Sequence, residues 1–310
     1  MRLPLFDGHC DTPWEMARTG CGLKSNSLHM DLERSWKFSP YAQMFAIWAP
    51  PEACEDGDRF TPILNNLLAE LDKNSEKIIL CKSAMQARSA FRSGKTAAFI
   101  ALEGAHIIYC RPDLLEIAYS RGVRSLNITW NNANTLSGSH CQEPERGLSH
   151  LGRQFVRLCN RLGILVDVSH LSEPGFWDVA ETTSSPIIAS HSNSRGVFDH
   201  TRNLSDDQFR AIIQLGGVAG INLCPDFIGA KPDLDSLIEH ILHFLDLGGE
   251  KNISIGTDFD GIDMPVKGIG GIDDLDRLYD KMLSCGIDEK TAEDIFFNNL
   301  MRVVNQVCTI

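Results

Sequence analysis

Eight short apolar runs alternate with helical stretches along most of this 310-residue chain. Each run has the length and the Val, Ile, Leu and Ala content of a buried parallel strand. The runs are residues 2–7, 43–48, 97–102, 125–129, 164–168, 186–190, 217–222 and 252–257. Strands that alternate with helices build parallel sheets, and eight such units close into a barrel. The pattern therefore predicts an α/β fold, a (β/α)8 TIM barrel.

The intervals between the runs carry helical periodicity, with start and stop signals. Ser205-Asp206-Asp207 precedes one helix, and Gly248-Gly249 follows another. We expect helices at residues 58–72, 84–93, 112–120, 151–162, 174–182, 206–214 and 234–247, then at 273–285 and 289–305. No Pro/Gly/Ser-rich linker divides the chain, so residues 1–310 are predicted to form a single barrel domain with C-terminal helices.

The amino-acid composition excludes some classes of binding partner. The net charge is −12, and Lys and Arg are not clustered, which argues against nucleic acid and against an anionic membrane surface. The 10 cysteines include no Cys-x-x-Cys pair and fit a reduced, cytoplasmic setting. No apolar run is long enough to span a bilayer. We expect a cytoplasmic protein that acts on a small molecule.

Six side chains of the kinds that bind metals lie just past apolar runs. They are His9, Asp11, Glu103, His170, His191 and Asp258. The carboxyl ends of barrel strands meet at one face, where barrels of this type hold their active sites, so these side chains should converge. Residues two apart in a strand share a face, so His9 and Asp11 can point together into the mouth while Cys10 points toward the helices.

The residue types predict a metal hydrolase. Imidazole and carboxylate ligands suit Zn²⁺ first, with Mn²⁺, Co²⁺ or Fe²⁺ as alternatives. The two oxygens of Glu103 could bridge two cations. Asp258 could be a further ligand, or it could take a proton from metal-bound water and return it to a leaving amine. Asp260 is its rival for that role, although the glycine that follows favours a turn.

These residues resemble those of a known family, the membrane (renal) dipeptidases, zinc peptidases on a (β/α)8 barrel related to the amidohydrolases. The opening DGHCDTPW is similar to that family's DGHNDxPW signature, and ALEGA, DVSH, ASHSNSR, TRNLSDD and GTDFDG match later blocks in the same order. The resemblance spans Asp7 to Gly261 and continues into the C-terminal helices. It implies a dipeptidase, tolerant of a D-residue at the C-terminal position of its substrate, and a homodimer.

The resemblance also implies a ligand set for two zinc ions. His9 and Asp11 would hold one ion, Glu103 would bridge, and His170 and His191 would hold the second. On this interpretation a hydroxide that bridges the two ions attacks the peptide carbonyl.

Two further roles follow from the resemblance. Asp258 would be the general acid and base that protonates the leaving amine, and Arg202 would bind the C-terminal carboxylate of the dipeptide. A guanidinium group suits the second role because its fork makes two parallel hydrogen bonds to a carboxylate.

The sequence departs from the family pattern at two substrate-binding positions. Trp130 stands where many members have a histidine that assists the scissile carbonyl, so His140, Asn131 or zinc alone are the candidates for that role. Trp130 would then form a wall of the substrate pocket. Phe227 stands in place of a tyrosine, which removes one hydrogen bond to substrate. The long loop 131–150 is a candidate substrate lid.

Two other functions remain open. The same metals could hydrolyse a lactone, an N-acyl amino acid or a cyclic amide, or the barrel could bind a metal or a small peptide without turnover. The remaining histidines are expected to be structural. His240 and His243, three apart on one predicted helix, could bind a metal, but an ordinary helix face is the preferred interpretation.

Overall fold

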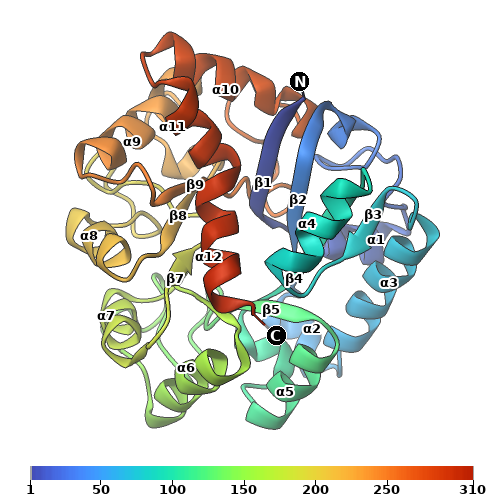
Figure 1. Cartoon of the computed structure of the whole chain (residues 1–310). Helices are drawn as coiled ribbons and strands as arrows, with labels where there is room; N and C mark the ends of the chain where they lie inside the picture. The colour runs from blue at the N-terminus through green and yellow to red at the C-terminus, as the bar shows by residue number, and fades with distance from the viewer. Residues whose placement is uncertain (1, 310) are drawn as a thin grey trace.

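A ring of parallel strands surrounded by helices forms the centre of the molecule in the computed structural model, which describes residues 2–309 (Figure 1). The strands are β1 (Leu3–Cys10), β2 (Phe38–Ile47), β3 (Ile78–Leu80), β4 (Thr96–Glu103), β5 (Val123–Asn127), β6 (Leu165–Asp167), β7 (Ile187–Ala189), β8 (Val218–Ile221) and β9 (Ile253–Ile255). Their order is β2-β1-β9-β8-β7-β6-β5-β4-β3, and β2 also pairs with β4. This pairing closes eight strands into the predicted (β/α)8 barrel.

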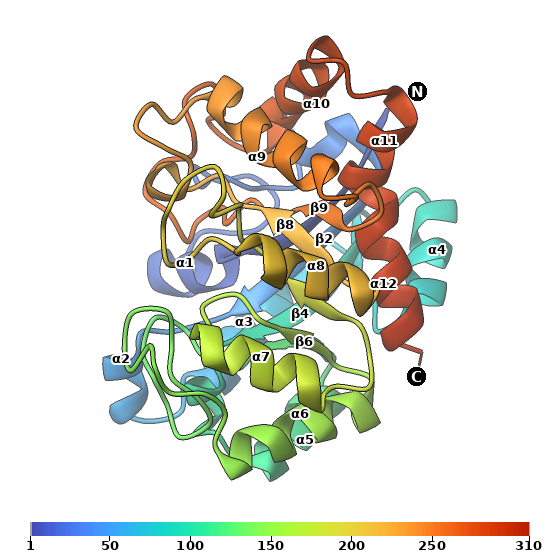
Figure 2. The same cartoon turned by 90° about the vertical axis from the view of Figure 1, so that its left-hand side faces the viewer.

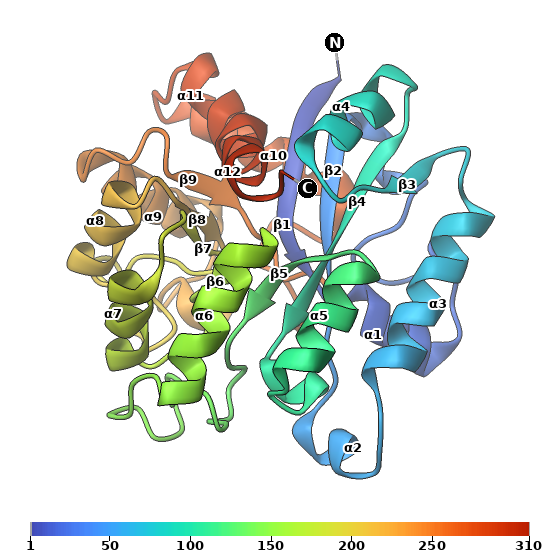
Figure 3. The same ribbon diagram turned by 60° about the horizontal axis from the view of Figure 1, so that its bottom comes forward.

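The ninth strand, β3, lies outside the ring. It pairs with the beginning of β4, where Ile78 lies opposite Thr96, whereas β5 pairs with the later part of β4, from Ile100 onward (Figure 3). The sequence analysis did not predict this strand. Three residues are too few to show a strand periodicity, and its position depends on β4 rather than on any local signal.

The helices follow the predicted alternation. They are α1 (Thr12–Thr19), α2 (Pro51–Glu55), α3 (Phe60–Lys73), α4 (Ala84–Arg92), α5 (Pro112–Ser120), α6 (His150–Leu162), α7 (Glu173–Thr182), α8 (Asp206–Gln214), α9 (Leu234–Asp246), α10 (Leu275–Ser284), α11 (Glu289–Glu293) and α12 (Asn299–Val307). The bounds of α5 and α8 agree with the prediction at both ends. Ser205 caps α8 in a reciprocal capping box with Gln208, as the local sequence indicates.

Short helical turns supplement these elements, at Arg34–Lys37, Ala105–Ile108, Pro225–Phe227 and Ile272–Asp274. The helix predicted at 289–305 is divided by a π-helical turn, Asp294–Asn298, between α11 and α12. Helices α1 and α2 were not predicted, since both are short and begin beside a proline rather than with a long apolar period. No helix between residues 2 and 309 combines the length and hydropathy needed to cross a bilayer.

Aromatic side chains fill the interior of the barrel on the side away from the ligand-bearing strand ends. The rings of Phe6 and Phe99 stack with their centroids 5.5 Å apart, although β2 separates their strands, so both rings lie inside the barrel. Phe297 of the π-helical turn contacts Phe6, and α12 packs into the same apolar cluster. Figure 2 shows α12 at the end of the barrel opposite α1 and the long loops. One end is therefore closed by apolar packing, which leaves the other for polar chemistry.

Candidate metal centre

A local irregularity in β1 directs His9 into the barrel mouth. Asp7 lies opposite Gln43 of β2, but Cys10 lies opposite Phe45, so three steps along β1 match two along β2. In a regular strand His9 would face outward with Leu5, which belongs to the helix-facing core. The extra residue is a β-bulge, a device that re-aims side chains. Strand alternation alone therefore does not explain the predicted pairing of His9 with Asp11.

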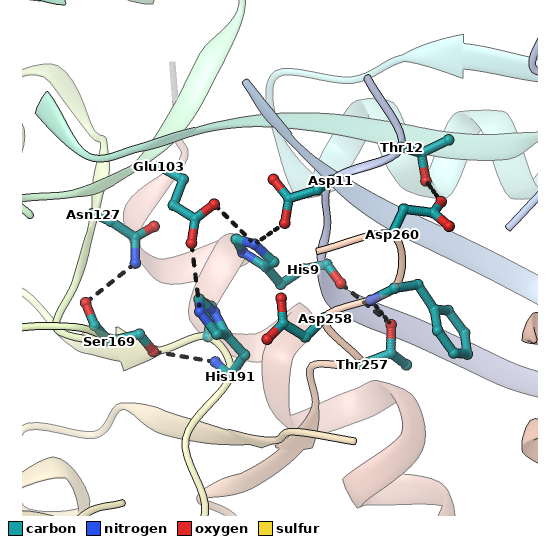
Figure 4. A network of polar contacts seen from close by, with 12 residues as sticks. His9, Asp11, Thr12, Glu103, Asn127, Ser169, His191, Thr257, Asp258 and Asp260 are labelled. Atoms are coloured by element: carbon teal, nitrogen blue, oxygen red, sulfur yellow. Dashed lines mark hydrogen bonds and ion pairs between the residues drawn. The ribbon is translucent and has the colours of Figure 1, made fainter. Parts of the chain in front are cut away.

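The two side chains do meet, as the sequence predicted. Nε2 of His9 lies 3.3 Å from Oδ2 of Asp11. Asp11 directly follows β1 and is the N-cap residue of α1. Cys10 packs into the helix-facing core instead. Figure 4 shows Asp11, Glu103, His191 and Asp258 around the ring of His9.

Glu103 lies between two pairs of candidate ligands. It ends β4 on the same face as Phe99, so it points into the barrel. One of its oxygens, Oε2, lies 3.5 Å from Nε2 of His9. The other, Oε1, lies 3.0 Å from Nε2 of His170 and 3.7 Å from Nε2 of His191. The carboxylate therefore faces a His/Asp pair with one oxygen and a His/His pair with the other.

The polar atoms of this cluster fit a bound cation. Oδ1 of Asp11 is buried without a hydrogen-bond partner among the described residues. Nε2 of His170 and Nε2 of His191 are only 2.8 Å apart. Nδ1 of His170 donates to the side-chain oxygen of Asn131 at 2.8 Å, so its Nε2 carries the lone pair, which lies 3.1 Å from Nη2 of Arg202. Unpaired acceptors that converge in a buried site are what a divalent metal satisfies.

Electrostatics keep the second pair of histidines neutral. Burial, followed by the nearby charge of Arg202, lowers the pKa of His170 to about 4. Burial, together with His9, lowers the pKa of His191 well below its ordinary value. Burial alone would raise the pKa of Glu103, but His9 and His170 hold it well below its ordinary value. His170 and His191 are therefore in the neutral form that binds metals and Glu103 is ionised, whereas the pKa of His9, which burial alone would lower, is raised well above its ordinary value by Glu103 and Asp11.

Asp258 belongs to the same cluster, because a carboxylate oxygen of Asp258 lies with the ligand atoms of His9 and Asp11, all within 4.8 Å of one another. Its backbone is left-handed, with φ of 62°. The side-chain amide of Asn222 donates to its Oδ2 at 2.9 Å. Burial raises the pKa of Asp258, a direction suited to a group that exchanges protons near neutral pH.

Asp260, the rival for the acid and base role, is engaged elsewhere. Its Oδ2 accepts from the hydroxyl of Thr12 at 2.6 Å, and its Oδ1 accepts from the backbone amide of His29 at 2.6 Å. Its φ of 68° is that of a turn residue. With both oxygens occupied, Asp260 anchors the loop around His29.

Arg202 reaches the cluster from the loop between β7 and α8. Its Nη2 lies 3.1 Å from Nε2 of His170, and its Nη1 donates to the hydroxyl of Ser192 at 3.3 Å. The ring of Phe227 lies 5.5 Å from its Cζ atom. Arg202 lines a small cavity of about 170 Å³ behind His170.

The main cavity of the barrel mouth measures about 540 Å³. Asp11, Glu103 and Asp258 line it, and so do Trp130 and Phe227, the two residues that the sequence analysis proposes as substrate-binding positions. Trp130 belongs to a larger aromatic wall. Its ring centroid is 5.0 Å from that of Trp48, and Trp48 is 5.6 Å from Trp14.

His140 and Asn131 support His170. Nε2 of His140 donates to the same oxygen of Asn131 that His170 uses, at 2.9 Å, and the hydroxyl of Thr201 lies 2.9 Å from Nδ1 of His140. Burial lowers the pKa of His140 to about 2, with a further contribution from the charge of Arg202. The chain from Thr201 to His170 therefore consists of neutral hydrogen-bonding groups.

The loop 131–150 is fixed in place by its own hydrogen bonds and by α7. Arg146 donates to the carbonyls of Asn134 and Ser137, and the hydroxyl of Ser172 donates to the carbonyl of Arg146. In this structure the loop forms a wall of the site.

His240 and His243 do not share a ligand position. His240 is buried between the backbone amide of Ser194 and the carbonyl of Ile228, and His243 lies 2.8 Å from Asp206.

The sequence analysis missed several residues that shape the site. Trp48 and Asn222 follow strands, as the ligands do, but neither is a metal-binding type or an ionisable group. Thr201 precedes Arg202 in a loop and contributes only through His140. The strand-end position was the one available signal for Trp48 and Asn222.

The whole chain matches a known family. A sequence model described as membrane dipeptidase, peptidase family M19, covers residues 1–310. The chain belongs to the membrane dipeptidase family. An uncharacterized dipeptidase of Schizosaccharomyces pombe is 31% identical over 303 residues, which is 89% of this chain and 71% of that relative.

Solved structures of this family share the fold. The metallo peptidase of Rhodobacter sphaeroides, liganded with a phosphinate mimic of the dipeptide L-Ala-D-Ala, has a TM-score of 0.90 and 28% identity, with 99% of this chain and 100% of the other covered. Dipeptidase AC, a metallo peptidase of family M19, has a TM-score of 0.91 and 28% identity, with 100% of both chains covered.

Membership of the membrane dipeptidase family has two chemical consequences. The protein is a dipeptidase of the metallopeptidase type, a hydrolase whose substrate is a small peptide. The family also implies a divalent metal, and the cluster around Glu103 and His9 is a possible ligand set for it.

Proposed function

We propose that this dipeptidase uses two zinc ions, held by the five ligands predicted from the sequence. The observation that carries the proposal is the position of Glu103, whose two oxygens face separate pairs of ligands. His9 and Asp11 would hold one ion and His170 and His191 the other. Histidine and carboxylate ligands favour zinc, and a bridging carboxylate is the usual feature of a two-metal hydrolase.

The bound metals would activate a water molecule and neutralise charge on the carbonyl oxygen. The chain's own residues would move the proton. Asp258 would accept it from the attacking water and donate it to the leaving amine, while Asn222 holds Oδ2 of Asp258 in place. The raised pKa of Asp258 supports this role, because a carboxyl group that ionises closer to neutrality is a better proton donor.

Arg202 would orient the substrate by binding its C-terminal carboxylate. The guanidinium group is buried beside His170, so a carboxylate there would be held near the second pair of ligands. We also propose that a D-residue is accepted at this end of the substrate. The phosphinate mimic of L-Ala-D-Ala bound to the Rhodobacter sphaeroides structure supports this part of the proposal.

The test is hydrolysis of L,L- and L,D-dipeptides by zinc-loaded and by chelator-stripped protein, with metal content measured in the same samples. We expect cleavage that requires metal, with two zinc ions per chain. An N-acyl amino acid and a lactone run alongside, and activity confined to them would assign another amidohydrolase-type reaction. Metal binding without hydrolysis of any compound would indicate a binding protein, and activity that survives complete metal removal would contradict the proposal.

A further inference from the structure

The aromatic wall of the main cavity has a chemistry that the proposed metal site does not require. We define it by Trp14, Trp48 and Trp130, whose rings contact one another in sequence and all line the cavity. All three indoles are half-buried. Nε1 of Trp48 has no hydrogen-bond partner among the described residues. The wall is large, rigid and apolar, and it is not needed to hold the ligands.

The order of the strands places this wall relative to Arg202. Trp14 follows β1, Trp48 follows β2 and Trp130 follows β5, whereas Arg202 follows β7. In the ring, β1, β2, β4 and β5 are consecutive neighbours, and β7 lies beyond β6. A dipeptide with its carboxylate at Arg202 and its peptide bond at Glu103 therefore extends its other residue toward β1 and β2. That residue is the amino-terminal one.

Two carboxylates that line the cavity outside the metal cluster are already engaged by other residues. Glu15 lines the same cavity, but Arg18 already donates to both of its oxygens, at 3.1 and 2.6 Å. Asp260 also lines the cavity, and both of its oxygens are engaged by Thr12 and His29. Asp263 also lines the cavity; it is exposed, and no described residue pairs with it. The preference for an apolar side chain is therefore expected from the indole rings and not from the charge of the cavity.

We propose that the aromatic wall selects dipeptides whose amino-terminal residue carries an aromatic side chain. Flat rings gain both buried apolar area and favourable edge or offset contacts from indole neighbours. The cavity of about 540 Å³ has the size of a pocket for a small organic ligand and leaves room for such a ring. This inference rests on the proposed dipeptidase function and names the substrate class of the same site.

The first experiment compares kcat/KM for Phe-Ala, Ala-Ala, Lys-Ala and Ala-Phe with the zinc-loaded protein. We expect Phe-Ala to exceed each of the others by about tenfold or more, because a well-formed apolar pocket discriminates at that level for a large side chain. Equal rates on Phe-Ala and Ala-Ala, or a preference for Lys-Ala or Ala-Phe, would overturn the inference while leaving the dipeptidase function intact.

Two variants test whether the aromatic wall is responsible for the preference for Phe-Ala. Trp48→Leu and Trp130→Leu keep an apolar side chain but remove the ring, and each should reduce the ratio of Phe-Ala to Ala-Ala several-fold. Trp177→Leu is the matched control, since Trp177 lies on α7, is exposed and does not line the cavity. An unchanged ratio in both wall variants would contradict the proposal.

Binding provides a readout that does not depend on turnover. The zinc-loaded Asp258→Asn protein is titrated with Phe-Ala and with Ala-Ala while tryptophan fluorescence is followed. Tighter binding of Phe-Ala by about tenfold, lost in the double variant with Trp48→Leu, supports the wall as the binding surface. Equal affinity for the two dipeptides would reject it, even if no dipeptide were hydrolysed by the unmodified enzyme.

Discussion

The side-chain oxygen of Asn131 accepts a hydrogen bond from Nδ1 of His170 at 2.8 Å, which places the lone pair of the imidazole on Nε2, the atom that faces Glu103. Partners of this kind fix the tautomer and orientation of a ligand histidine, and their loss usually weakens metal binding by 10- to 100-fold. We expect Asn131→Ala to lower zinc affinity by about that factor, whereas Asn131→Asp should retain the acceptor. Competition with a chelator measures the zinc affinity of both variants. An unchanged affinity in Asn131→Ala would show that the contact is dispensable.

Replacement of Asp258 separates proton transfer from metal binding. Asp258→Asn should retain zinc but lose kcat by about 10²- to 10⁴-fold, because the amide cannot exchange the proton. Asp260→Asn is the matched control, since both oxygens of Asp260 are used in structural hydrogen bonds. Metal analysis and steady-state kinetics distinguish the two. A near-normal kcat for Asp258→Asn would remove it from the acid and base role.

Arg202→Met tests the proposed carboxylate site. The variant keeps a long side chain but loses the charge, so KM for free dipeptides should rise by about 10- to 100-fold. Dipeptide amides, which lack the carboxylate, should be affected much less. An equal loss on free and amidated substrates would indicate that Arg202 acts by positioning His170, which it contacts at 3.1 Å.

His240 should make the fold sensitive to acid. Burial lowers the pKa of His240, whose Nδ1 accepts from Ser194 and whose Nε2 donates to Ile228. The unfolded chain binds a proton below its ordinary pKa of about 6.5, whereas the folded chain does not, so the free energy of unfolding falls as pH drops below that value. The loss from this group approaches about 1.4 kcal/mol per pH unit.

Comparison with His240→Gln isolates this contribution. Glutamine cannot titrate, so the free energy of unfolding of the variant should decline less between pH 7 and pH 5 than that of the unmodified protein. Denaturant unfolding at the two pH values is the measurement. Parallel declines in the two proteins would assign the acid sensitivity to other groups.

Gly256→Ala should disrupt the support of His191. A Cβ atom at Gly256 would lie 1.7 Å from the carbonyl oxygen of Ser190, which is backbone and cannot rotate away. We expect a loss of at least about 3 kcal/mol in unfolding free energy, as for severe overpacking. Gly270→Ala is the control, because its Cβ would approach nothing closer than Asp274, at 3.3 Å. Thermal unfolding of both variants is sufficient, and equal stability would contradict the expectation.

The sequence predicts the barrel because each barrel strand carries its own periodic signal, and the boundaries of α5 and α8 follow from local proline and capping residues. It does not predict β3, whose three residues gain their conformation from pairing with β4. The convergence of Asp11 and Glu103 follows from strand ends meeting at one face, whereas the orientation of His9 also requires the bulge in β1, which had no signal in the sequence. The contacts within the aromatic wall could not be predicted in this way, because Trp14, Trp48 and Trp130 are far apart in sequence and have no shared spacing.

The bulge in β1 determines which of the side chains after it face the barrel mouth and which face the helices. Before it, Phe6 faces inward and Leu5 outward; after it, His9 faces the mouth and Cys10 the helices. The chain carries one residue more between Asp7 and Cys10 than regular pairing with β2 requires, and without the bulge that accommodates it the imidazole would turn toward the helices. The orientation of His9 therefore depends on the backbone conformation of this short segment as much as on residue identity, and removal of Gly8 would restore plain alternation with the imidazole still toward the mouth.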